Sequence, residues 1–409
     1  MSVLFFDISE KIIRSQIIVF FYPQAIITIF LRYSSIMNRA NTILPNMLEW
    51  AVTRAGHEYQ AYLDEHDNVR KWAMGEKNPT LKQLEEFAHS LHVPLGYLFL
   101  AEPPREEMPI PMFRRVNDRL NIDIFDTVNI LRDRQEWLRQ YLIQLDSPEL
   151  PFVAVHNQND SPADICATMR QVLSLPIDWA IKLRTTEDAL NRLAEVMEKH
   201  GVIVNFNSIV GSNTHRTLSV EDCRGFALAD KYAPFIFVNS KDVKAAQVFT
   251  LAHEFAHLLI GYSAGLGNME LEQTPAMEQL CNAVAAEFLL PRALFNILWH
   301  NYNDDFDSIS RKAKISRYVA ARCARDYGYI TTEEYRQHYH QWQQEPQPQK
   351  KGSGGDFYVN AIRRTSRTFL LYVNSALSSN QILHTEAYRL TGLKGDTYRK
   401  VFNSQYIYE

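Results

Sequence analysis

The sequence predicts a mostly helical α+β fold with three parts: an N-terminal bundle of short helices, a core with a small sheet, and a helical C-terminal region. Apolar residues recur at helical spacing along most of the 409 residues. Three short apolar runs, at 202–204, 225–228 and 235–239, are typical of strands. A hydrophobic content of 46% and a net charge of −4 indicate a globular protein of two or three domains. This charge gives no general affinity for nucleic acid.

Residues 1–36 form an apolar N-terminal extension. Its stretch Ile17–Leu31 contains Pro23 and Gln24, and it is shorter than the roughly 20 residues that span a bilayer. It also lacks a good signal-peptide cleavage site, so we expect no membrane partner. We interpret residues 1–36 as an upstream extension of a mis-assigned start, because the sequence after Met37 is typical of the start of a regulator. A packed N-terminal strand or helix is the alternative.

We predict a domain of short helices over residues 37–103. Thr80 and Gln83 have the spacing of a capping box, and the apolar residues that follow recur at helical spacing. The run from Trp72 to Ala88 resembles the Xre-type helix-turn-helix domain.

That resemblance implies that the helix before the tryptophan enters the DNA major groove. Asn68, Arg70 and Lys71 would then contact DNA. The stretch 58–70 is shorter than in that family and has no clear glycine turn. A purely structural helical domain is therefore the alternative.

A proline-rich segment, residues 104–118, predicts an extended linker to a core domain at 119–342. Within this core, Phe125–Leu145 has the apolar spacing of a long amphipathic helix.

The most informative motif is the run from His253 through Glu254 to His257. Two histidines four positions apart on a helix share one face and can bind one Zn²⁺, and the glutamate between them can activate a metal-bound water. We expect a helix here, capped by Ser240 and ended by Gly261. The alternative is a metal-free buried helix, which would cost on the order of several kcal/mol.

A catalytic zinc needs a third protein ligand and an open position for water. We predict a second helix that is capped by Thr274 and ends at Pro291. Glu278 and Glu287 are nine positions apart and so lie on opposite faces of this helix, which leaves only one to face the metal. We favour Glu278, because Asn282 and small residues share its face and allow the helices a close approach. Glu287 stays open as the alternative.

Four segments carry a shared pattern: 224–228, 234–239, the histidine helix and 278–291. Together they resemble the ImmA/IrrE family of bacterial and phage metallopeptidases. The resemblance implies a zincin-like core in which His253, His257 and Glu278 bind Zn²⁺ and Glu254 is the general base. It also implies a protein substrate, a DNA-binding repressor or antitoxin, whose cleavage derepresses stress or mobile-element genes. Asn282 would lie just behind the ligands.

Peptide hydrolysis at such a zinc also needs a group that stabilises the oxyanion. Tyr262, His215 and Tyr232 are candidates that the sequence does not rank. The predicted strand at 235–239 directly precedes the histidine helix, so a substrate could add to it by β-augmentation.

The C-terminal third contains two further helical segments. Residues 308–335 have helix-turn-helix spacing; we favour a structural role for them, and DNA binding is the alternative. Residues 343–356 are rich in Gln, Pro, Lys and Gly and predict a flexible linker. Residues 357–409 predict a small helical module, in which 385–393 resembles another helix-turn-helix and the basic residues fit DNA or a protein partner.

The sequence leaves two classes of function open. The first is a zinc endopeptidase, and the second is a non-proteolytic DNA-binding regulator or antitoxin that binds a toxin. DNA, a cognate toxin and a second copy of the chain, in a homodimer, are candidate partners. The four cysteines include no Cys-x-x-Cys pair, which fits a reducing cytoplasm.

Overall fold

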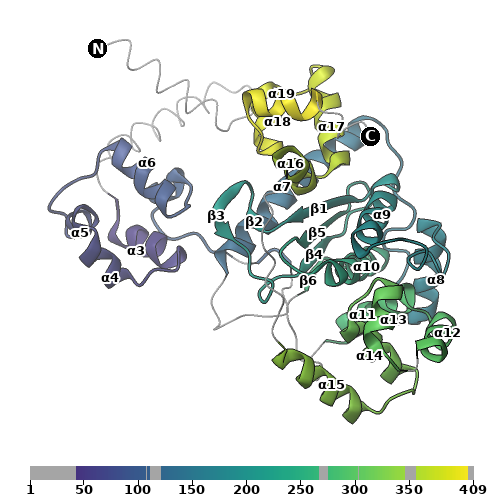
Figure 1. The fold of residues 1–409 in the computed structure, drawn as a ribbon. Helices are drawn as coiled ribbons and strands as arrows, with labels where there is room; N and C mark the ends of the chain where they lie inside the picture. The colour runs from purple at the N-terminus through teal and green to yellow at the C-terminus, as the bar shows by residue number, and fades with distance from the viewer. Residues whose placement is uncertain are drawn as a thin grey trace. The chain divides into compact units, whose positions relative to one another are not determined.

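The computed structural model describes residues 43–106, 108–110, 121–266, 275–302, 304–345 and 356–403. The chain divides into two compact units, Met1–Glu107 and Met108–Glu409 (Figure 1). The predicted N-terminal extension, the start at Met37 and most of the two predicted linkers lie outside the described residues. Within the described ranges, no single helix has both the length and the apolar composition needed to cross a membrane.

The first unit is a bundle of short helices around its own apolar core. The predicted capping box of Thr80 and Gln83 is confirmed at the start of the helix that begins at Leu81. A single residue, His66, separates the second helix from the third, and its ring stacks on Tyr62 at 3.9 Å. The elements are α3 (Pro45–Arg54), α4 (Tyr59–Glu65), α5 (Asp67–Ala73), α6 (Leu81–Ser90) and the 3-10 helix η1 (Leu95–Phe99).

A four-stranded sheet organises the second unit, with strand order β1-β5-β4-β6. β1 (Ile203–Asn207) runs parallel to β5 (Phe235–Asn239), whereas β4 (Gly225–Leu228) is antiparallel to both β5 and β6 (Ala264–Leu266). The predicted bounds of the strands at 225–228 and 235–239 are confirmed. The first strand was predicted at 202–204, but it begins at Ile203 and continues to Asn207. A separate pair consists of β2 (Ile209–Val210) and β3 (Asn213–Thr217).

Helices cover both faces of this sheet (Figure 1). Alternate residues of β5 enter different cores, as the period of a strand requires: Ile236 and Val238 pack with one set of helices, and Phe235 and Phe237 with another. The first set includes α8 (Pro162–Leu173), α9 (Thr186–Lys199), α10 (Lys244–Ile260) and α11 (Ala276–Leu289). The second set includes α7 (Ile122–Gln144), the predicted long amphipathic helix, and the C-terminal helices.

Further helices extend the first core. The arginines of the predicted helix-turn-helix at 308–335 are used inside the protein: Arg317 lies 4.9 Å from the ring of Trp342, and Arg325 lies 4.8 Å from the ring of Tyr335. These contacts support the structural role that the sequence favours for this segment. The helices are α12 (Arg292–Tyr302), α13 (Phe306–Ala313), α14 (Arg317–Asp326) and α15 (Thr332–Gln344).

The C-terminal helices share the second core with α7 and the sheet. Phe369 is fully buried there, and Nε of the buried Arg134 donates to the carbonyl oxygen of Leu390 at 2.7 Å. Basic residues of this region also make contacts within the chain; for example, Arg363 lies over Phe206 at 4.8 Å, and Arg389 pairs with Glu386. The helices are α16 (Phe357–Thr365), α17 (Arg367–Ser378), α18 (His384–Thr391) and α19 (Gly395–Asn403).

Glu198 connects α9 to the turn between α16 and α17, where the Ser366 hydroxyl donates to its carboxylate. Burial raises the pKa of Glu198 to about 7, and the hydrogen bond from Ser366 opposes this only in part. A carboxyl whose pKa is higher in the folded than in the unfolded chain stabilises the fold at low pH. That stabilisation is lost as the pH rises through the pKa that the carboxyl has in the folded chain.

Glu198→Gln is therefore expected to flatten the pH dependence of stability. Between pH 5 and pH 8 the wild type should lose on the order of 1–3 kcal/mol of unfolding free energy through this group. Urea unfolding at the two pH values measures the loss. Glu195→Gln on the same helix is the control, because the ion pair with Lys199 lowers the pKa of Glu195. Equal pH slopes in the wild type and Glu198→Gln would contradict the expectation.

Candidate metal centre

The histidine motif lies on α10, as expected, but the predicted cap at Ser240 is wrong. The helix begins at Lys244 with Val243 at the N-cap position and no side-chain cap. Instead, the side chain of Gln247 reaches back from the helix and donates to the carbonyl oxygens of Ser240 and Asp242. The predicted end is confirmed, because Gly261 adopts a left-handed conformation with φ of 77°.

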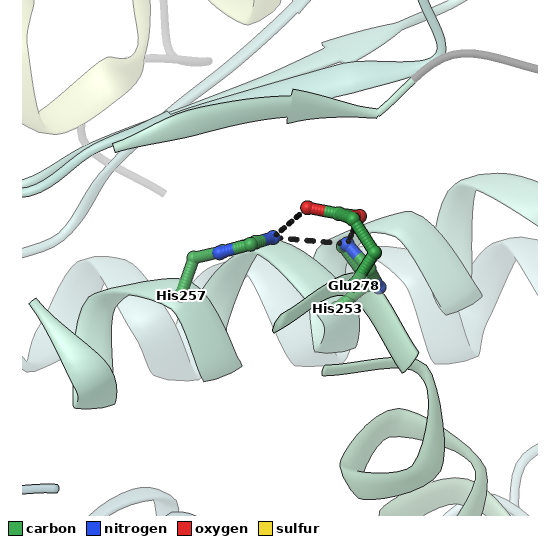
Figure 2. A group of neighbouring side chains, drawn as sticks. All are labelled: His253, His257 and Glu278. Atoms are coloured by element: carbon green, nitrogen blue, oxygen red, sulfur yellow. Dashed lines mark hydrogen bonds and ion pairs between the residues drawn. The ribbon is translucent and has the colours of Figure 1, made fainter. Parts of the chain in front are cut away.

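α11 supplies the acidic partner. It begins at Ala276 after Pro275, and the predicted cap at Thr274 lies outside the described residues. The helix ends at Leu289, shortly before Pro291, as predicted. Its first turn carries Glu278, whose side chain is fully buried beside α10 (Figure 2).

His253, His257 and Glu278 converge in a buried group (Figure 2). The two Nε2 atoms lie 3.1 Å apart. Glu278 Oε2 lies 3.0 Å from Nε2 of His253, and Oε1 lies 3.1 Å from Nε2 of His257. All three side chains are at most 1% exposed. One ligand atom from each residue therefore lies within 4.8 Å of the other two.

This donor set fits a small divalent cation such as Zn²⁺. Ligands on a tetrahedral zinc with bonds of about 2.1 Å are separated by about 3.4 Å, close to the distances observed between these atoms. Two neutral imidazole nitrogens and a carboxylate are all electron-pair donors, so a cation between them would satisfy all three. His253, His257 and Glu278 could hold the metal, which leaves a fourth position for water or substrate.

The electrostatics of the three residues also suit metal binding. Burial alone would raise the pKa of Glu278, but the two imidazoles outweigh it and hold the pKa at about 2. Burial lowers the pKa of His257, although Glu278 opposes this shift. Near neutral pH the carboxylate is therefore charged and this imidazole is neutral, which are the forms that bind a metal.

Glu254 lies beside the three-residue group but does not belong to it. Its side chain is fully buried, and neither carboxylate oxygen has a hydrogen-bond partner among the described residues. Burial first, and the charge of Glu278 second, raise its pKa well above the ordinary value. An unpaired buried carboxylate is costly, and it is typical of a functional site rather than of a packing position.

Gly225 on β4 makes room for Glu254. A Cβ atom at this position would lie 2.4 Å from Cγ2 of Thr250, 2.7 Å from the carbonyl oxygen of Phe237 and 3.2 Å from Oε1 of Glu254. The motif helix can therefore approach the sheet this closely only where the strand has no side chain.

Gly225→Ala is expected to force α10 away from β4. Overpacking of this kind costs about 1–3 kcal/mol, which urea unfolding would measure as a lower midpoint. Gly96→Ala is the matched control, because a Cβ atom at Gly96 meets nothing within 4 Å. Equal stability losses in the two variants would contradict this explanation.

The two glutamates of α11 face different neighbours, as their spacing on the helix predicts. Glu287 accepts a hydrogen bond from the hydroxyl of Tyr327 at 2.8 Å, while Glu278 faces the histidines. Asn282 is half-buried on α11, one turn after Glu278. The structure thus brings Glu278, and not Glu287, to the histidines.

The three oxyanion candidates lie in different places. The ring of Tyr262 is 6.1 Å from that of His257. Tyr232 packs against the second core, and His215 is an exposed residue of β3. Only Tyr262 of these three is placed beside a residue of the metal centre.

The expectation that a substrate adds to the strand at 235–239 is wrong. β5 is an interior strand, with β1 paired along one edge and β4 along the other. No edge remains on it for a peptide.

The three predicted DNA-contact residues, Asn68, Arg70 and Lys71, lie on α5 in the first unit. Arg70 and Lys71 both pair with Asp67 on the same helix. Their contact with DNA stays a prediction.

One neighbour of the site was not among the candidate residues taken from the sequence. Cys281 is fully buried, and its Sγ lies 3.6 Å from Nδ1 of His257. Burial raises the pKa of this thiol well above its ordinary value, and Glu278 adds to the rise. The sequence signal was its position three residues after Glu278, on nearly the same helix face.

Comparison with known protein families gives a match over the same part of the chain. Residues 197–324 match the family model Peptidase_M78, described as an IrrE N-terminal-like domain. This stretch includes β1, α10 and α11, and so all three residues of the metal centre. Residues 365–404 match a domain of unknown function, DUF8813. No curated protein matches the chain. The first match supports a metallopeptidase of the ImmA/IrrE type.

Proposed function

We propose that the chain is a zinc-dependent endopeptidase that acts in regulation by cleaving a DNA-binding repressor or an antitoxin. The observation that carries this proposal is the buried convergence of His253, His257 and Glu278, with the unpaired carboxylate of Glu254 beside them. The match of the surrounding residues to a peptidase family supports it. Cleavage of such a substrate would derepress stress or mobile-element genes.

In this proposal His253, His257 and Glu278 hold the metal and Glu254 moves the proton. A bound zinc would supply Lewis acidity, polarising the scissile carbonyl and making its water more acidic. Glu254 takes the proton from the attacking water and delivers it to the leaving amine. Its high pKa in the metal-free chain suits a group that must hold this proton briefly. A nearby metal charge would lower that pKa and allow Glu254 to act as a base.

The alternative is a non-proteolytic regulator or antitoxin, in which the helices of the first unit bind DNA or a toxin. The exposed basic residues Arg70 and Lys71 on α5 favour it. A purely structural metal site, however, has no need of Glu254. A carboxylate buried without a partner among the described residues is a cost that a reaction would explain.

The proposal can be tested before the substrate is identified. Cells expressing the wild-type chain or Glu254→Gln would be compared for protein N-termini that are newly formed. We expect a small set that depends on the wild type and includes a DNA-binding regulator or an antitoxin. Purified protein should reproduce the cleavage, lose it after chelation and regain it with added Zn²⁺. If the two proteins give the same N-termini, the non-proteolytic alternative is favoured.

A further inference from the structure

Cys281 lies directly behind one histidine of the metal centre. It is on α11, one turn after Glu278, and it is fully buried. Its Sγ lies 3.6 Å from Nδ1 of His257, which is hydrogen-bond distance for sulfur. The other ring nitrogen, Nε2, faces His253 and Glu278. The two nitrogens of His257 therefore have separate partners.

This arrangement bears on the tautomer of His257. An imidazole that binds a metal through Nε2 carries its proton on Nδ1, and the group that accepts this proton orients the ring. In most metal sites the acceptor is a carboxylate, a backbone carbonyl or a water. At His257 the neighbouring acceptor is a sulfur atom. Nδ1 of His253, in contrast, is buried with no hydrogen-bond partner in the described parts of the chain.

The sulfur is not placed as a metal ligand. Its atom is not part of the group of ligand atoms that lie within 4.8 Å of one another. It approaches His257 from the Nδ1 side, whereas the group forms on the Nε2 side.

We propose that Cys281 is a positioning residue for the metal centre. Its Sγ accepts the hydrogen bond from Nδ1–H of His257, which fixes the tautomer whose Nε2 lone pair points to the metal. The thiol keeps its own proton and forms no bond to the metal. This inference rests on the proposed function, because it assumes that the three residues bind a cation.

The test uses the full chain and measures Zn²⁺ affinity by competition with a chromophoric chelator. Cys281→Val keeps a side chain of similar size without an acceptor, and Cys281→Ser keeps an acceptor. We expect Cys281→Val to bind Zn²⁺ about 10–100-fold more weakly, and Cys281→Ser to recover most of the loss. Cys323→Ala is the matched control: Cys323 is 1% exposed in the same core, and its loss should leave the affinity unchanged.

The tautomer itself gives a second measurement. In ¹⁵N-histidine-labelled protein loaded with Zn²⁺, the ring nitrogens of His257 should show the proton on Nδ1. The ¹H shift of this proton should lie further downfield in the wild type than in Cys281→Val, which offers no acceptor. A packing role alone would not move this signal.

Several results would overturn the proposal. They are equal Zn²⁺ affinity in the wild type and Cys281→Val, a loss in Cys281→Ser as large as that in Cys281→Val, or a wild-type proton on Nε2. The last result decides the matter even if the variants do not fold. Failure of the wild type to bind Zn²⁺ would instead overturn the proposed function, and with it the premise of this inference.

Discussion

Glu254→Gln is expected to keep the metal content of the wild type while peptide-bond cleavage slows by at least about 100-fold. General acid–base catalysis typically contributes about 10²–10⁴-fold, and an amide of the same size cannot accept the proton. The metal should stay, because Glu254 lies outside the group formed by His253, His257 and Glu278. Metal analysis of the purified variant and the cleavage rate of the identified substrate measure the two parts of this result.

The same variant should be at least as stable as the wild type when no metal is bound. Burial raises the pKa of Glu254 in the folded chain, so its contribution to stability is present at low pH and is lost as the pH rises. An uncharged amide removes this pH-dependent loss. Metal-free Glu254→Gln should therefore unfold at higher urea concentration than metal-free wild type above neutral pH. Functional groups are often held at such a cost in stability.

Two outcomes would count against this role for Glu254. One is cleavage at the wild-type rate in the Gln variant. The other is loss of the metal together with activity, which would make Glu254 a part of the binding site. Glu195→Gln, which changes an exposed carboxylate on α9, is a suitable control for the substitution itself.

The sheet shows which features were predictable. The run at 235–239 could be assigned as a strand, because β-branched and aromatic residues are dense there. The run at 225–228 could be assigned because it is short and apolar. Strand order could not be assigned in the same way. β5 directly precedes α10 in the sequence, yet β1, which comes before β2, β3 and β4 in the chain, pairs along one of its edges. A pairing between distant segments leaves no local signal, and the expectation of an open edge failed for this reason.

The metal centre likewise has features that the sequence predicts and features that it does not. The spacing of His253 and His257 and the opposite faces of Glu278 and Glu287 follow from helix geometry, and the structure places these residues accordingly. Gly225 lies on a strand that passes over α10, and its closeness to Glu254 depends on how the sheet and the helix pack. Contacts of this kind are tertiary, so the sequence alone did not reveal them.

The C-terminal helices illustrate the limit for domain organisation. Amphipathic spacing in 357–402 predicted helices, and helices are present. The composition of 343–356 suggested a flexible linker before a separate module. Phe369, Leu370 and Val373 are nevertheless fully buried in the core that α7 and the sheet share. Periodicity shows that a helix has an apolar face, but it does not identify what covers that face.

Glu278→Ala and His253→Ala are expected to abolish stoichiometric metal binding. Removal of one of three protein ligands should weaken Zn²⁺ binding by more than about 100-fold, because even residues behind the ligands contribute about 10–100-fold. Glu278→Gln should behave like the alanine variant. It keeps the shape of the side chain but loses the negative charge, which the imidazoles stabilise by holding the pKa at about 2. Metal content after dialysis and chelator competition give the measurement.

Glu287→Ala is the control that makes this prediction decisive. Both glutamates lie on α11, but Glu287 bonds to Tyr327, 40 residues away in sequence, rather than to the histidines. Its loss should cost about 1 kcal/mol of stability through that hydrogen bond and leave the metal in place. Full occupancy in Glu278→Ala, with loss in Glu287→Ala, would reassign the third ligand. Loss in both would show that the metal depends on the packing of α11 as a whole, so only the contrast between the two variants identifies Glu278 as the ligand.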